Sequence, residues 1–329
     1  MNSTDKKQVL IIGGGFAGLN VAKALGNKNQ VEVTIVDRRN YHLFQPLLYQ
    51  VATAGLSPAD IATPIRDVLS KYPNVNVALD EITGFDAKNR IAKSKTREYK
   101  FDYAVVACGS SHSYFGKDDW EDAAPGLKTL EQATEIRRRI LTAFEKAEIA
   151  TDENLKTAAL TFVVIGGGPT GVELSGSIAE LARGTLNRDF RHFDPRSAKI
   201  ILIEGGSRLV SAFPEELSAN ALKSLQDLGV QVRLGTRVTG VSDKGVNVGD
   251  EFIPCHTILW AAGVATNPIA RILPGEKDQS GRVVISIDLS IPSYRNIFVL
   301  GDMAHFDLRM GKTLPGLAPV ALQQGRHAA

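Results

Sequence analysis

Cysteine is scarce in this 329-residue chain, which contains only Cys108 and Cys255. The two are not arranged as a CxxC or CxxxxC pair, which argues against a dithiol redox centre and against a cysteine-ligated zinc site. Such low cysteine usage is typical of a reducing compartment. The six histidines show no ligand spacing of the HExxH kind, so we expect no metal site.

Long apolar runs and an excess of charge are also missing. No run reaches the roughly 18 apolar residues of a transmembrane helix, and the apolar stretch Val9–Ile12 is too short for the core of a signal peptide. Because 38 Lys and Arg oppose 36 Asp and Glu, the charge gives no argument for nucleic-acid binding. With 43% hydrophobic residues over 329 positions, we expect a globular protein of two domains.

An internal repeat gives the strongest information on organisation. The stretch QVLIIGGGFAGLNVAKAL begins at Gln8, and TFVVIGGGPTGVELSGSIAEL begins at Thr161. Each joins an apolar β-branched run to a group of glycines and then to a helical pattern. Two copies at this distance indicate two similar βαβ domains, because the repeats of a solenoid are far shorter. The expected fold class is α/β with two Rossmann-like dinucleotide-binding domains.

The first glycine group has the spacing G-x-G-x-x-G directly after a strand, with Gly13, Gly15 and Gly18. The first glycine permits a tight turn, the second lets the backbone approach a pyrophosphate, and the third lets helix and strand pack closely. The following helix N-terminus offers free N–H groups to phosphates. Asp37 ends the next strand 19 residues past Gly18, where a carboxylate accepts hydrogen bonds from ribose hydroxyls. Three glycines at this spacing without the adjoining strand, helix and acid have an alternative explanation, which is a tight turn with no ligand.

The second glycine group repeats the spacing with Gly166, Gly168 and Gly171. Its strand-terminal acid is Glu204, later than usual, because Gly184–Ala198 lengthens the crossover. A carboxylate at this position repels a 2′-phosphate and favours NADH over NADPH. Arg208 lies close enough in the sequence to weaken this inference.

Periodicity predicts the other elements. Strands are expected at Val31–Asp37, Val75–Ile82, Tyr99–Ala107, Lys199–Glu204, Val230–Leu234, Thr257–Ala261 and Asn296–Gly301, with a hairpin in Val238–Ile253. Helices are expected at Ser57–Tyr72, Leu130–Ala150, Pro214–Leu228 and Pro319–Ala329. In the first of these, Ser57 is the predicted N-cap and Pro58 the first helical residue.

The segment NIFVLGDMA, residues 296–304, is a strand that ends in Gly301 and Asp302. It resembles the return segment of two-dinucleotide flavoproteins, in which such an aspartate binds the ribityl hydroxyl of the flavin. YAVVACG (Tyr103–Gly109) and ILWAAG (Ile258–Gly263) resemble the strands that close the two nucleotide sites of that group. For Asp302 alone, a helix N-cap is the alternative.

Over essentially its whole length the sequence resembles the type II NADH:quinone oxidoreductases, which are single-subunit enzymes that do not pump protons. The resemblance rests on the two glycine segments and on VDRRNYHLFQPLLYQVATAGLSPADIATPIR, SHSYFG, VLGDMA and LPGLAPVALQQG. It implies bound FAD, oxidation of NADH, and reduction of a quinone at the inner face of the cell membrane, reached from the cytoplasm. It also implies an FAD-binding domain in residues 1–120, an inserted NADH-binding domain in residues 121–285, and a return segment in residues 286–329.

The resemblance also implies site residues. The FAD set is Gly13, Gly15, Phe16, Ala17, Gly18, Asp37, Arg38, Ala107, Gly109 and Asp302, with Gln45, Pro46 and Gln50 near the isoalloxazine ring. The NADH set is Gly166, Gly168, Pro169, Thr170, Gly171, Glu204, Ala262 and Gly263. Glu173 matches a glutamate beside the nicotinamide, and Gln323 and Gln324 match contacts on the quinone side of the flavin.

Two departures from the family pattern qualify these expectations. Cys108 stands where relatives often have threonine, and a buried small residue is its simplest interpretation. Family members usually continue well past Ala329, into amphipathic helices that sit on the membrane and complete the quinone tunnel. We therefore expect FAD and NADH binding from these residues and weak membrane binding without the anchor. A homodimer is the expected assembly.

The sequence leaves several alternatives open. Glu173 either pairs with the dipole of its helix or positions nicotinamide or a proton, and His42 either touches the flavin or makes a structural hydrogen bond. FQPLLYQV is either core or a flavin-facing loop. Among enzymes, the competing classes are sulfide:quinone oxidoreductase, whose chemistry needs cysteines near the flavin, and ferredoxin reductase. A dinucleotide-binding redox sensor without turnover is the alternative outside enzymes.

Overall fold

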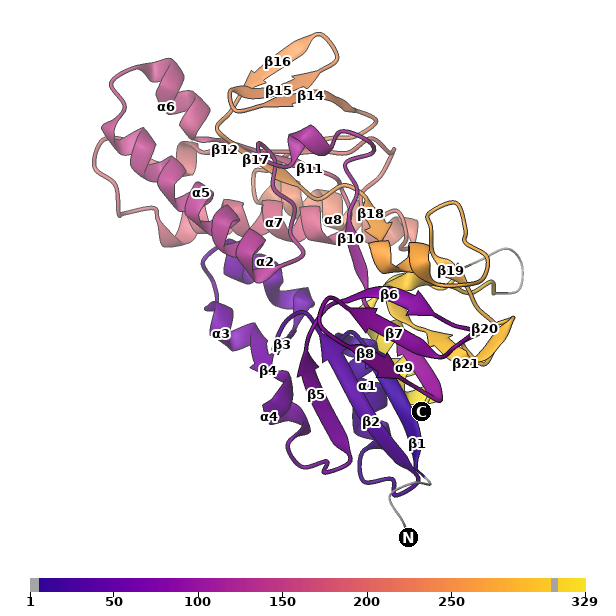
Figure 1. Cartoon of the computed structure of the whole chain (residues 1–329). Helices are drawn as coiled ribbons and strands as arrows, with labels where there is room; N and C mark the ends of the chain where they lie inside the picture. Colours follow the sequence, from indigo (N-terminus) through magenta and orange to yellow (C-terminus); the bar gives the residue numbers. More distant parts are fainter. Residues whose placement is uncertain (1–5, 309–312) are drawn as a thin grey trace. The chain divides into compact units, whose positions relative to one another are not determined.

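The computed structural model describes residues 6–308 and 313–329 (Figure 1). Its backbone contacts form two compact units. Unit 1 comprises Met1–Leu43, Ala62–Ser111 and Val264–Ala329, and unit 2 comprises Phe44–Ile61 and His112–Gly263. These boundaries lie before the predicted ones at 120/121 and 285/286. Segment Phe44–Ile61 falls in unit 2 because its helix α2 (Leu48–Ala52) packs against α5 (Leu130–Ile149) and α7 (Pro169–Glu180). Which unit binds which cofactor stays a prediction.

Unit 1 is built on a six-stranded sheet in the order β20-β21-β9-β1-β2-β5. These strands are β1 (Lys7–Ile12), β2 (Val31–Asp37), β5 (Val75–Leu79), β9 (Tyr103–Val106), β20 (Ser290–Ile291) and β21 (Tyr294–Val299). All neighbours pair in parallel except β20 with β21. The last four residues of the central strand β1 are Val, Leu, Ile and Ile, and all four are buried, as expected for a parallel strand covered on both faces.

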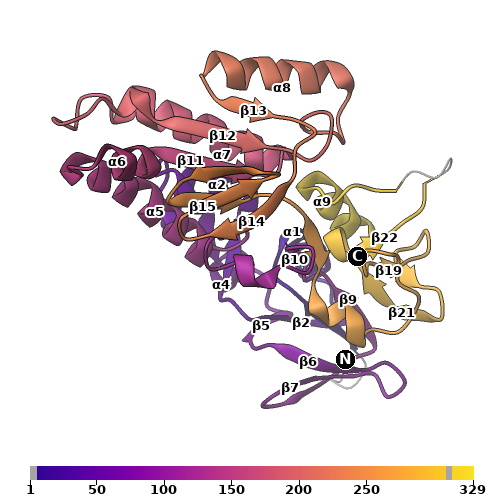
Figure 2. The same ribbon diagram turned by 90° about the horizontal axis from the view of Figure 1, so that it is seen from above.

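The two faces of this sheet are covered differently (Figures 1 and 2). Helices α1 (Phe16–Leu25) and α9 (Ala318–His327) lie on one side, and the antiparallel sheet of β6 (Ile82–Asp86), β7 (Ile91–Ser94) and β8 (Glu98–Lys100) lies on the other. The two helices approach closely because Gly325 has no side chain. A Cβ there would lie 2.5 Å from the carbonyl oxygen of Ala17 and 3.0 Å from Cβ of Asn20.

Unit 2 contains a four-stranded parallel sheet in the order β13-β12-β11-β17. The strands are β11 (Thr161–Ile165), β12 (Lys199–Ile203), β13 (Gln231–Arg233) and β17 (Thr257–Trp260). Helices α7 and α8 (Glu215–Asp227) flank one face, and the antiparallel sheet of β14 (Val238–Ser242), β15 (Gly245–Val248) and β16 (Glu251–Pro254) flanks the other (Figure 1). A buried cluster that includes Val163, Val246 and Trp260 joins the two sheets.

Shorter elements complete the two units. The remaining strands are β3 (Tyr41–Leu43), β4 (Ala62–Pro64), β10 (Ser110–His112), β18 (Val264–Thr266), β19 (Val283–Val284) and β22 (Ala304–His305). The remaining α-helices are α3 (Pro58–Ile61), α4 (Ile65–Leu69) and α6 (Glu153–Ala159). Single 3-10 turns occur at Gln45–Leu47, Asp118–Trp120, Pro195–Ser197, Pro268–Ile272 and Gly301–Met303, and a π-turn occurs at Leu181–Thr185.

Most predicted elements are confirmed to within a few residues, but the predicted helix Ser57–Tyr72 is wrong. It is divided into α3, strand β4 and α4, although Pro58 does begin the first piece. The break coincides with Pro64, which lacks an N–H and pushes the residue before it towards extended backbone. Strand β4 then pairs with β3, which gives the extended residues backbone partners.

Two predicted strands are also too long, and the predicted hairpin contains a third strand. Val75–Ile82 is divided at Asp80 between β5 and β6, and Tyr99–Ala107 is divided at Phe101–Asp102 between β8 and β9. Val238–Ile253 forms three antiparallel strands instead of a hairpin.

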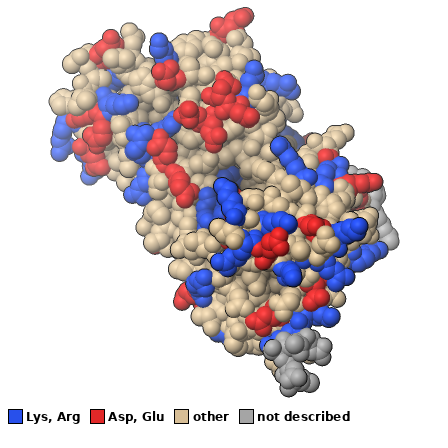
Figure 3. Space-filling view, in the orientation of Figure 1, with Lys and Arg blue, Asp and Glu red and all other residues tan. Residues whose placement is uncertain are grey.

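The surface carries both charge signs over the face in Figure 3, with Lys and Arg interspersed among Asp and Glu. This agrees with the net charge of +2, and among the described residues on this face neither sign covers the surface alone. Within the described ranges, every helix is too short or too polar to cross a membrane.

Candidate functional site

The glycine loop after β1 contains two glycines that the protein itself requires. Gly13 has φ +104°, and a Cβ there would lie 2.5 Å from the carbonyl oxygen of Ala107. A Cβ on Gly18 would collide with the carbonyl oxygen of Gly13. These two positions are therefore explained by the turn and by the packing of α1 against the sheet.

The middle glycine of the motif is different. Gly15 is exposed and extended, with φ −74° and ψ −166°, a conformation open to any residue. The nearest atom to a Cβ at this position would be the carbonyl oxygen of Ala107, at 3.9 Å. No neighbour in the protein demands glycine there, so the requirement fits a ligand that approaches the backbone closely. The loop therefore fits the pyrophosphate of a dinucleotide such as FAD.

The loop after β11 repeats this arrangement in unit 2. Gly166 has φ +111°, and its Cβ would lie 2.6 Å from the backbone of Ala261, while a Cβ on Gly171 would collide with Gly166. Gly168 is extended, with φ −72° and ψ 179°. A Cβ on Gly168 would meet no described atom within 4 Å. The second loop therefore has the same open position at its middle glycine and fits a second dinucleotide.

Each loop is fixed to a carboxylate at the end of the neighbouring strand. In unit 1, Asp37 accepts hydrogen bonds from the backbone N–H of Gly14 at 2.6 Å and of Arg39 at 2.7 Å. In unit 2, Glu204 accepts from the backbone N–H of Gly167 at 2.5 Å and of Gly206 at 2.6 Å. A carboxylate has about four acceptor positions. Both acids therefore retain acceptors for ribose hydroxyls.

His42 supports the first loop from the side. Its Nδ1 lies 3.0 Å from the carbonyl oxygen of Gly14, to which the protonated Nδ1 donates. Burial is the largest influence and lowers the histidine pKa, so the ring is neutral at physiological pH. The edge of the ring meets Phe16 at a centroid distance of 5.0 Å. Of the two interpretations left open by the sequence, the structure contains the structural hydrogen bond.

Asp302 lies in the 3-10 turn Gly301–Met303 that follows β21. Its Oδ2 accepts a hydrogen bond from the Ser110 hydroxyl at 2.7 Å. The backbone of Gly316 approaches the other carboxylate oxygen, because a Cβ on Gly316 would lie 3.2 Å from Oδ1. The turn follows β21, which pairs with β9 of the first Rossmann sheet. This places Asp302 at the carboxyl edge of the sheet that carries Gly15.

The two glutamines predicted for the quinone side differ in their surroundings. Gln323 is exposed on α9. Gln324 is 7% exposed, and its Oε1 accepts a hydrogen bond from the backbone N–H of Gly301 at 2.6 Å. Gln324 thus holds α9 against the turn that contains Asp302. Its predicted quinone contact remains a prediction, and no pattern along the chain indicated this structural bond.

Cys108 is half-buried, not fully buried as its simplest interpretation had it, and hydrogen bonds tie its backbone to the fold. Its backbone N–H donates to the sulfur of Met303 at 3.2 Å, and its carbonyl accepts from the side chain of Asn267 at 3.2 Å. Burial raises the pKa of the Cys108 thiol to about 12, and that of Cys255 to about 12 as well. Both thiols are therefore protonated and unreactive at neutral pH. The sequence did not single out Ser110, Asn267 or Met303.

Glu173 is the fifth residue of α7, just beyond the first helical turn. The stabilising effect of the helix dipole on an acid falls off within that first turn, which weakens the dipole explanation. Partial desolvation raises the pKa of the carboxyl to about 7, although the residue as a whole is exposed. Within the described part of the chain, its carboxylate makes no hydrogen bond or ion pair. A carboxyl that titrates near neutrality is suited to proton exchange.

The remaining predicted residues are distributed over both units, and Gln45, Pro46 and Gln50, predicted to lie near the isoalloxazine ring, fall in unit 2. Ala107 and Gly109 follow β9, Ala262 and Gly263 follow β17, and Ala17, Pro169 and Thr170 begin helices after the glycine loops. Arg38 is exposed and lies 3.7 Å from Glu81. Gln45 and Pro46 form the 3-10 turn before α2, in unit 2, and Gln50 donates to the Tyr49 hydroxyl at 3.0 Å.

The side chain of Arg208 is engaged in hydrogen bonds within its own loop, which limits its influence on the choice between NADH and NADPH. Its guanidinium donates to the carbonyl oxygens of Ser211 at 2.6 Å and Phe213 at 2.8 Å, and to the hydroxyl of Ser218 at 3.0 Å. These bonds order the loop before α8. They remove most of the reason to expect Arg208 to offset the charge of Glu204.

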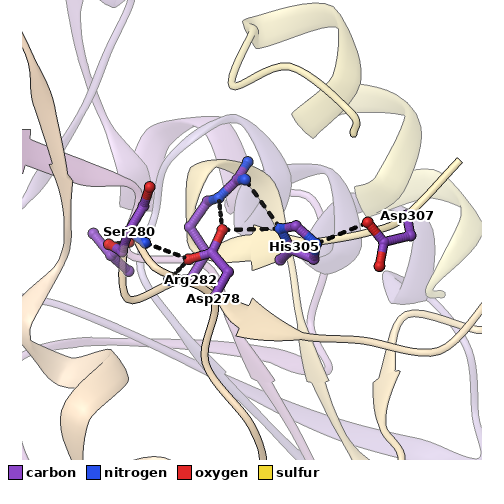
Figure 4. Close-up of polar contacts among 6 residues, drawn as sticks. Asp278, Ser280, Arg282, His305 and Asp307 are labelled. Carbon is purple, nitrogen blue, oxygen red and sulfur yellow. Dashed lines mark hydrogen bonds and ion pairs between the residues drawn. The ribbon is translucent and has the colours of Figure 1, made fainter. Parts of the chain in front are cut away.

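A partly buried charge cluster, with Asp307 exposed at one end, follows the turn of Asp302 (Figure 4). Asp278 accepts from Arg282 Nε at 2.7 Å and lies 2.9 Å from Nδ1 of His305, whose Nε2 lies 2.9 Å from Asp307. The cluster joins the loop before β19 to strand β22, which pairs with β19. It therefore anchors the chain directly after the Gly301–Met303 turn.

Comparisons with known proteins agree with this geometry. The family model described as pyridine nucleotide-disulphide oxidoreductase matches residues 7–325. The chain is 41% identical to a type II NADH:quinone oxidoreductase of Mycobacterium tuberculosis, over 98% of this chain and 72% of that protein.

Solved structures are similar in fold. NDH2 from Plasmodium falciparum, solved in complex with NADH, superposes with a TM-score of 0.83 at 22% identity, over 91% of this chain and 65% of that one. The sulfide:quinone oxidoreductase of Aquifex aeolicus superposes with a TM-score of 0.80 at 17% identity, over 97% and 75% of the two chains. Identities this low show the fold alone. The 41% identity to the type II NADH:quinone oxidoreductase decides which branch of the family this chain belongs to. The chain therefore belongs to the pyridine nucleotide-disulphide oxidoreductase family and, within it, to the type II NADH:quinone oxidoreductases.

Proposed function

We propose that this protein oxidises NADH with the help of bound FAD and passes the two electrons to a quinone. The observation that carries the proposal is the pair of glycine loops, each with an open middle glycine and a carboxylate fixed beside it. Two such loops in one chain accommodate two dinucleotides. The 41% identity to a protein named as a type II NADH:quinone oxidoreductase supports this choice of activity.

The residues of unit 1 fit FAD. Gly13, Gly15 and Gly18 with the start of α1 would hold the pyrophosphate, Asp37 the adenosine ribose, and Asp302 the ribityl chain. When bound, FAD supplies the two-electron chemistry that links a hydride donor to a quinone. His42 keeps the phosphate loop in shape through its bond to the Gly14 carbonyl, and Gln324 keeps the Asp302 turn in place.

The residues of unit 2 fit NADH. Gly166, Gly168 and Gly171 would hold the pyrophosphate, and Glu204 would accept hydrogen bonds from the adenosine ribose. The carboxylate of Glu204 also disfavours the extra phosphate of NADPH, and Arg208 is engaged elsewhere. We expect catalytic efficiency to be higher with NADH, and tenfold better use of NADPH would reverse this assignment.

Glu173 is the proposed protic residue. Reduction of a quinone by NADH consumes one proton in addition to the hydride, so a group that exchanges protons near pH 7 is useful at the site. We assign Glu173 to that exchange or to positioning nicotinamide, and Gln323 to the quinone side. The protein then acts at the cytoplasmic face of a membrane that contains the quinone, with a homodimer as its proposed assembly.

The competing activities make different demands on the chain. Sulfide oxidation needs reactive cysteines beside the flavin, whereas burial keeps Cys108 and Cys255 protonated. A ferredoxin reductase passes single electrons rapidly to an iron–sulfur protein and does not reduce quinones. A binding module would take up dinucleotides and leave the flavin oxidised.

A visible spectrum tests the proposal in three steps. The purified protein should be yellow, anaerobic NADH should bleach the flavin bands quickly, and a soluble quinone should restore them. A colourless protein that does not take up FAD removes the redox centre and contradicts the proposal. Bleaching by NADH with recovery only on addition of an iron–sulfur protein would favour a ferredoxin reductase.

A further inference from the structure

The carboxyl edge of the parallel sheet in unit 2 carries a cation without a partner. Arg237 follows β13 and is exposed. Across the described residues its guanidinium makes no hydrogen bond and no ion pair, whereas Arg233 on the preceding strand is paired with Glu251 at 2.6 Å. An unpaired arginine is ordinary on a surface, so its surroundings must decide whether it has a role.

Arg237 lies directly against the loop that contains Glu204. A Cβ on Gly205 would be 3.3 Å from Cγ of Arg237 and 3.7 Å from its Nε. The two loops are joined by backbone hydrogen bonds, from Thr236 N–H to the Glu204 carbonyl at 2.9 Å and from Gly235 N–H to the Gly206 carbonyl at 2.8 Å. The arginine stem is thus held beside the backbone that follows the ribose-binding acid.

The strand order places this arginine along the path of a dinucleotide. The pyrophosphate loop follows β11, Glu204 follows the adjacent strand β12, and Arg237 follows β13, which is adjacent to β12. Neighbouring strands are about 4.8 Å apart, and ligands of open α/β sheets bind outside the carboxyl ends of the strands. A nucleotide with its pyrophosphate at Gly168 and its adenosine ribose at Glu204 therefore directs its adenine towards the end of β13.

We propose that Arg237 forms one wall of the adenine subsite for NADH, with its guanidinium stacked on the base. A planar guanidinium stacks on aromatic faces and is weakly hydrated, which suits it to this contact. Gly205 leaves room for the arginine stem, and the absence of a competing carboxylate partner leaves the guanidinium available. This inference rests on the proposed NADH site and identifies a binding residue within it.

The test compares NADH with reduced nicotinamide mononucleotide, which lacks the adenosine half. In Arg237→Ala we expect the KM for NADH to rise roughly 3- to 30-fold with kcat unchanged. The KM for the mononucleotide should stay at the wild-type value. Arg188→Ala is the matched control, because Arg188 is an exposed arginine of unit 2 that lies in the segment before β12. It should leave both values unchanged.

The outcomes separate the possible failures. An unchanged KM for NADH in Arg237→Ala, or an equal rise for both substrates, overturns the inference. Arg237→Lys keeps the charge and loses the planar group, so full recovery in that variant would overturn stacking in favour of charge alone. If the wild-type flavin is not bleached by NADH in the same preparation, the proposed function itself fails. Thermal unfolding of each variant, followed by flavin release, identifies any variant that fails to fold.

Discussion

Gly168→Ala adds one methyl group to the second glycine loop at a place where the protein leaves room for it. The backbone there has φ −72° and ψ 179°, which alanine adopts without strain, and no described atom lies within 4 Å of the new Cβ. Replacing glycine at a compatible position stabilises by about 0.4–1 kcal/mol through the unfolded state. Alanine is a poorer N-cap by a similar amount. We expect the melting temperature to change by no more than about 2 °C.

The same methyl group should interfere strongly with NADH. If the pyrophosphate occupies the open face of Gly168, the added carbon crowds it at a cost typical of overpacking, about 1–3 kcal/mol. This corresponds to a roughly 5- to 150-fold increase in KM for NADH. FAD content should not change, because the substitution lies in the other glycine loop.

Gly166→Ala is the matched control. Its φ of +111° and the contact of 2.6 Å between the new Cβ and the Ala261 backbone should destabilise unit 2 by several kcal/mol. Steady-state kinetics with NADH, flavin absorbance and thermal unfolding are measured for both variants. Wild-type KM in Gly168→Ala would refute the assignment of the pyrophosphate to this loop. Marked unfolding of Gly168→Ala would refute the claim that the protein leaves the position open.

Three further predictions concern titratable groups. Because burial raises the pKa of Glu173 to about 7, the pH profile of quinone reduction should have an inflection near pH 7 that Glu173→Gln lacks; the same profile in both proteins would exclude the proton role. Because the pKa rises from 4.5 in the unfolded chain to about 7 in the folded protein, the carboxyl destabilises the fold increasingly from pH 4.5 to pH 7 and fully above pH 7. Glu173→Gln should therefore raise the melting temperature at pH 8 and raise it less at pH 5. Since the Cys108 thiol has a pKa of about 12, iodoacetamide at pH 8 should leave NADH:quinone activity intact, and rapid inactivation that Cys108→Ser abolishes would contradict the burial. Hydrogen bonds from Arg282 and His305 outweigh burial and hold the pKa of Asp278 below its usual value, so its stabilisation is present above pH 4 and is lost as pH falls further. Asp278→Asn should therefore lower stability at pH 7 by about 1.5–3 kcal/mol, and a difference from wild type that persists undiminished at pH 3 would contradict this assignment.

Local sequence rules predicted the parts of the fold that depend on short-range chemistry. Spacing and periodicity over neighbouring residues are enough to predict the strand–glycine–helix units. The same local patterns predict the strand-terminal acids and the long helix α5. They failed where one predicted segment is divided between two or three elements. The division of Ser57–Tyr72 into α3, β4 and α4 depends on pairing with β3, whose residues are distant enough in sequence that periodicity contains no information about them.

The amino-acid sequence by itself determined that this chain has two dinucleotide loops and an acid for each, because a glycine motif is a local backbone requirement. Only the tertiary structure decided which glycines serve the protein and which face a ligand. Gly13 and Gly15 are the same residue type two positions apart, yet one is packed against Ala107 and the other is open. The same holds for Gln324, which the structure places on the Gly301 amide. Burial, pKa and hydrogen-bond partners arise from residues brought together across the fold, and no spacing along the chain encodes them.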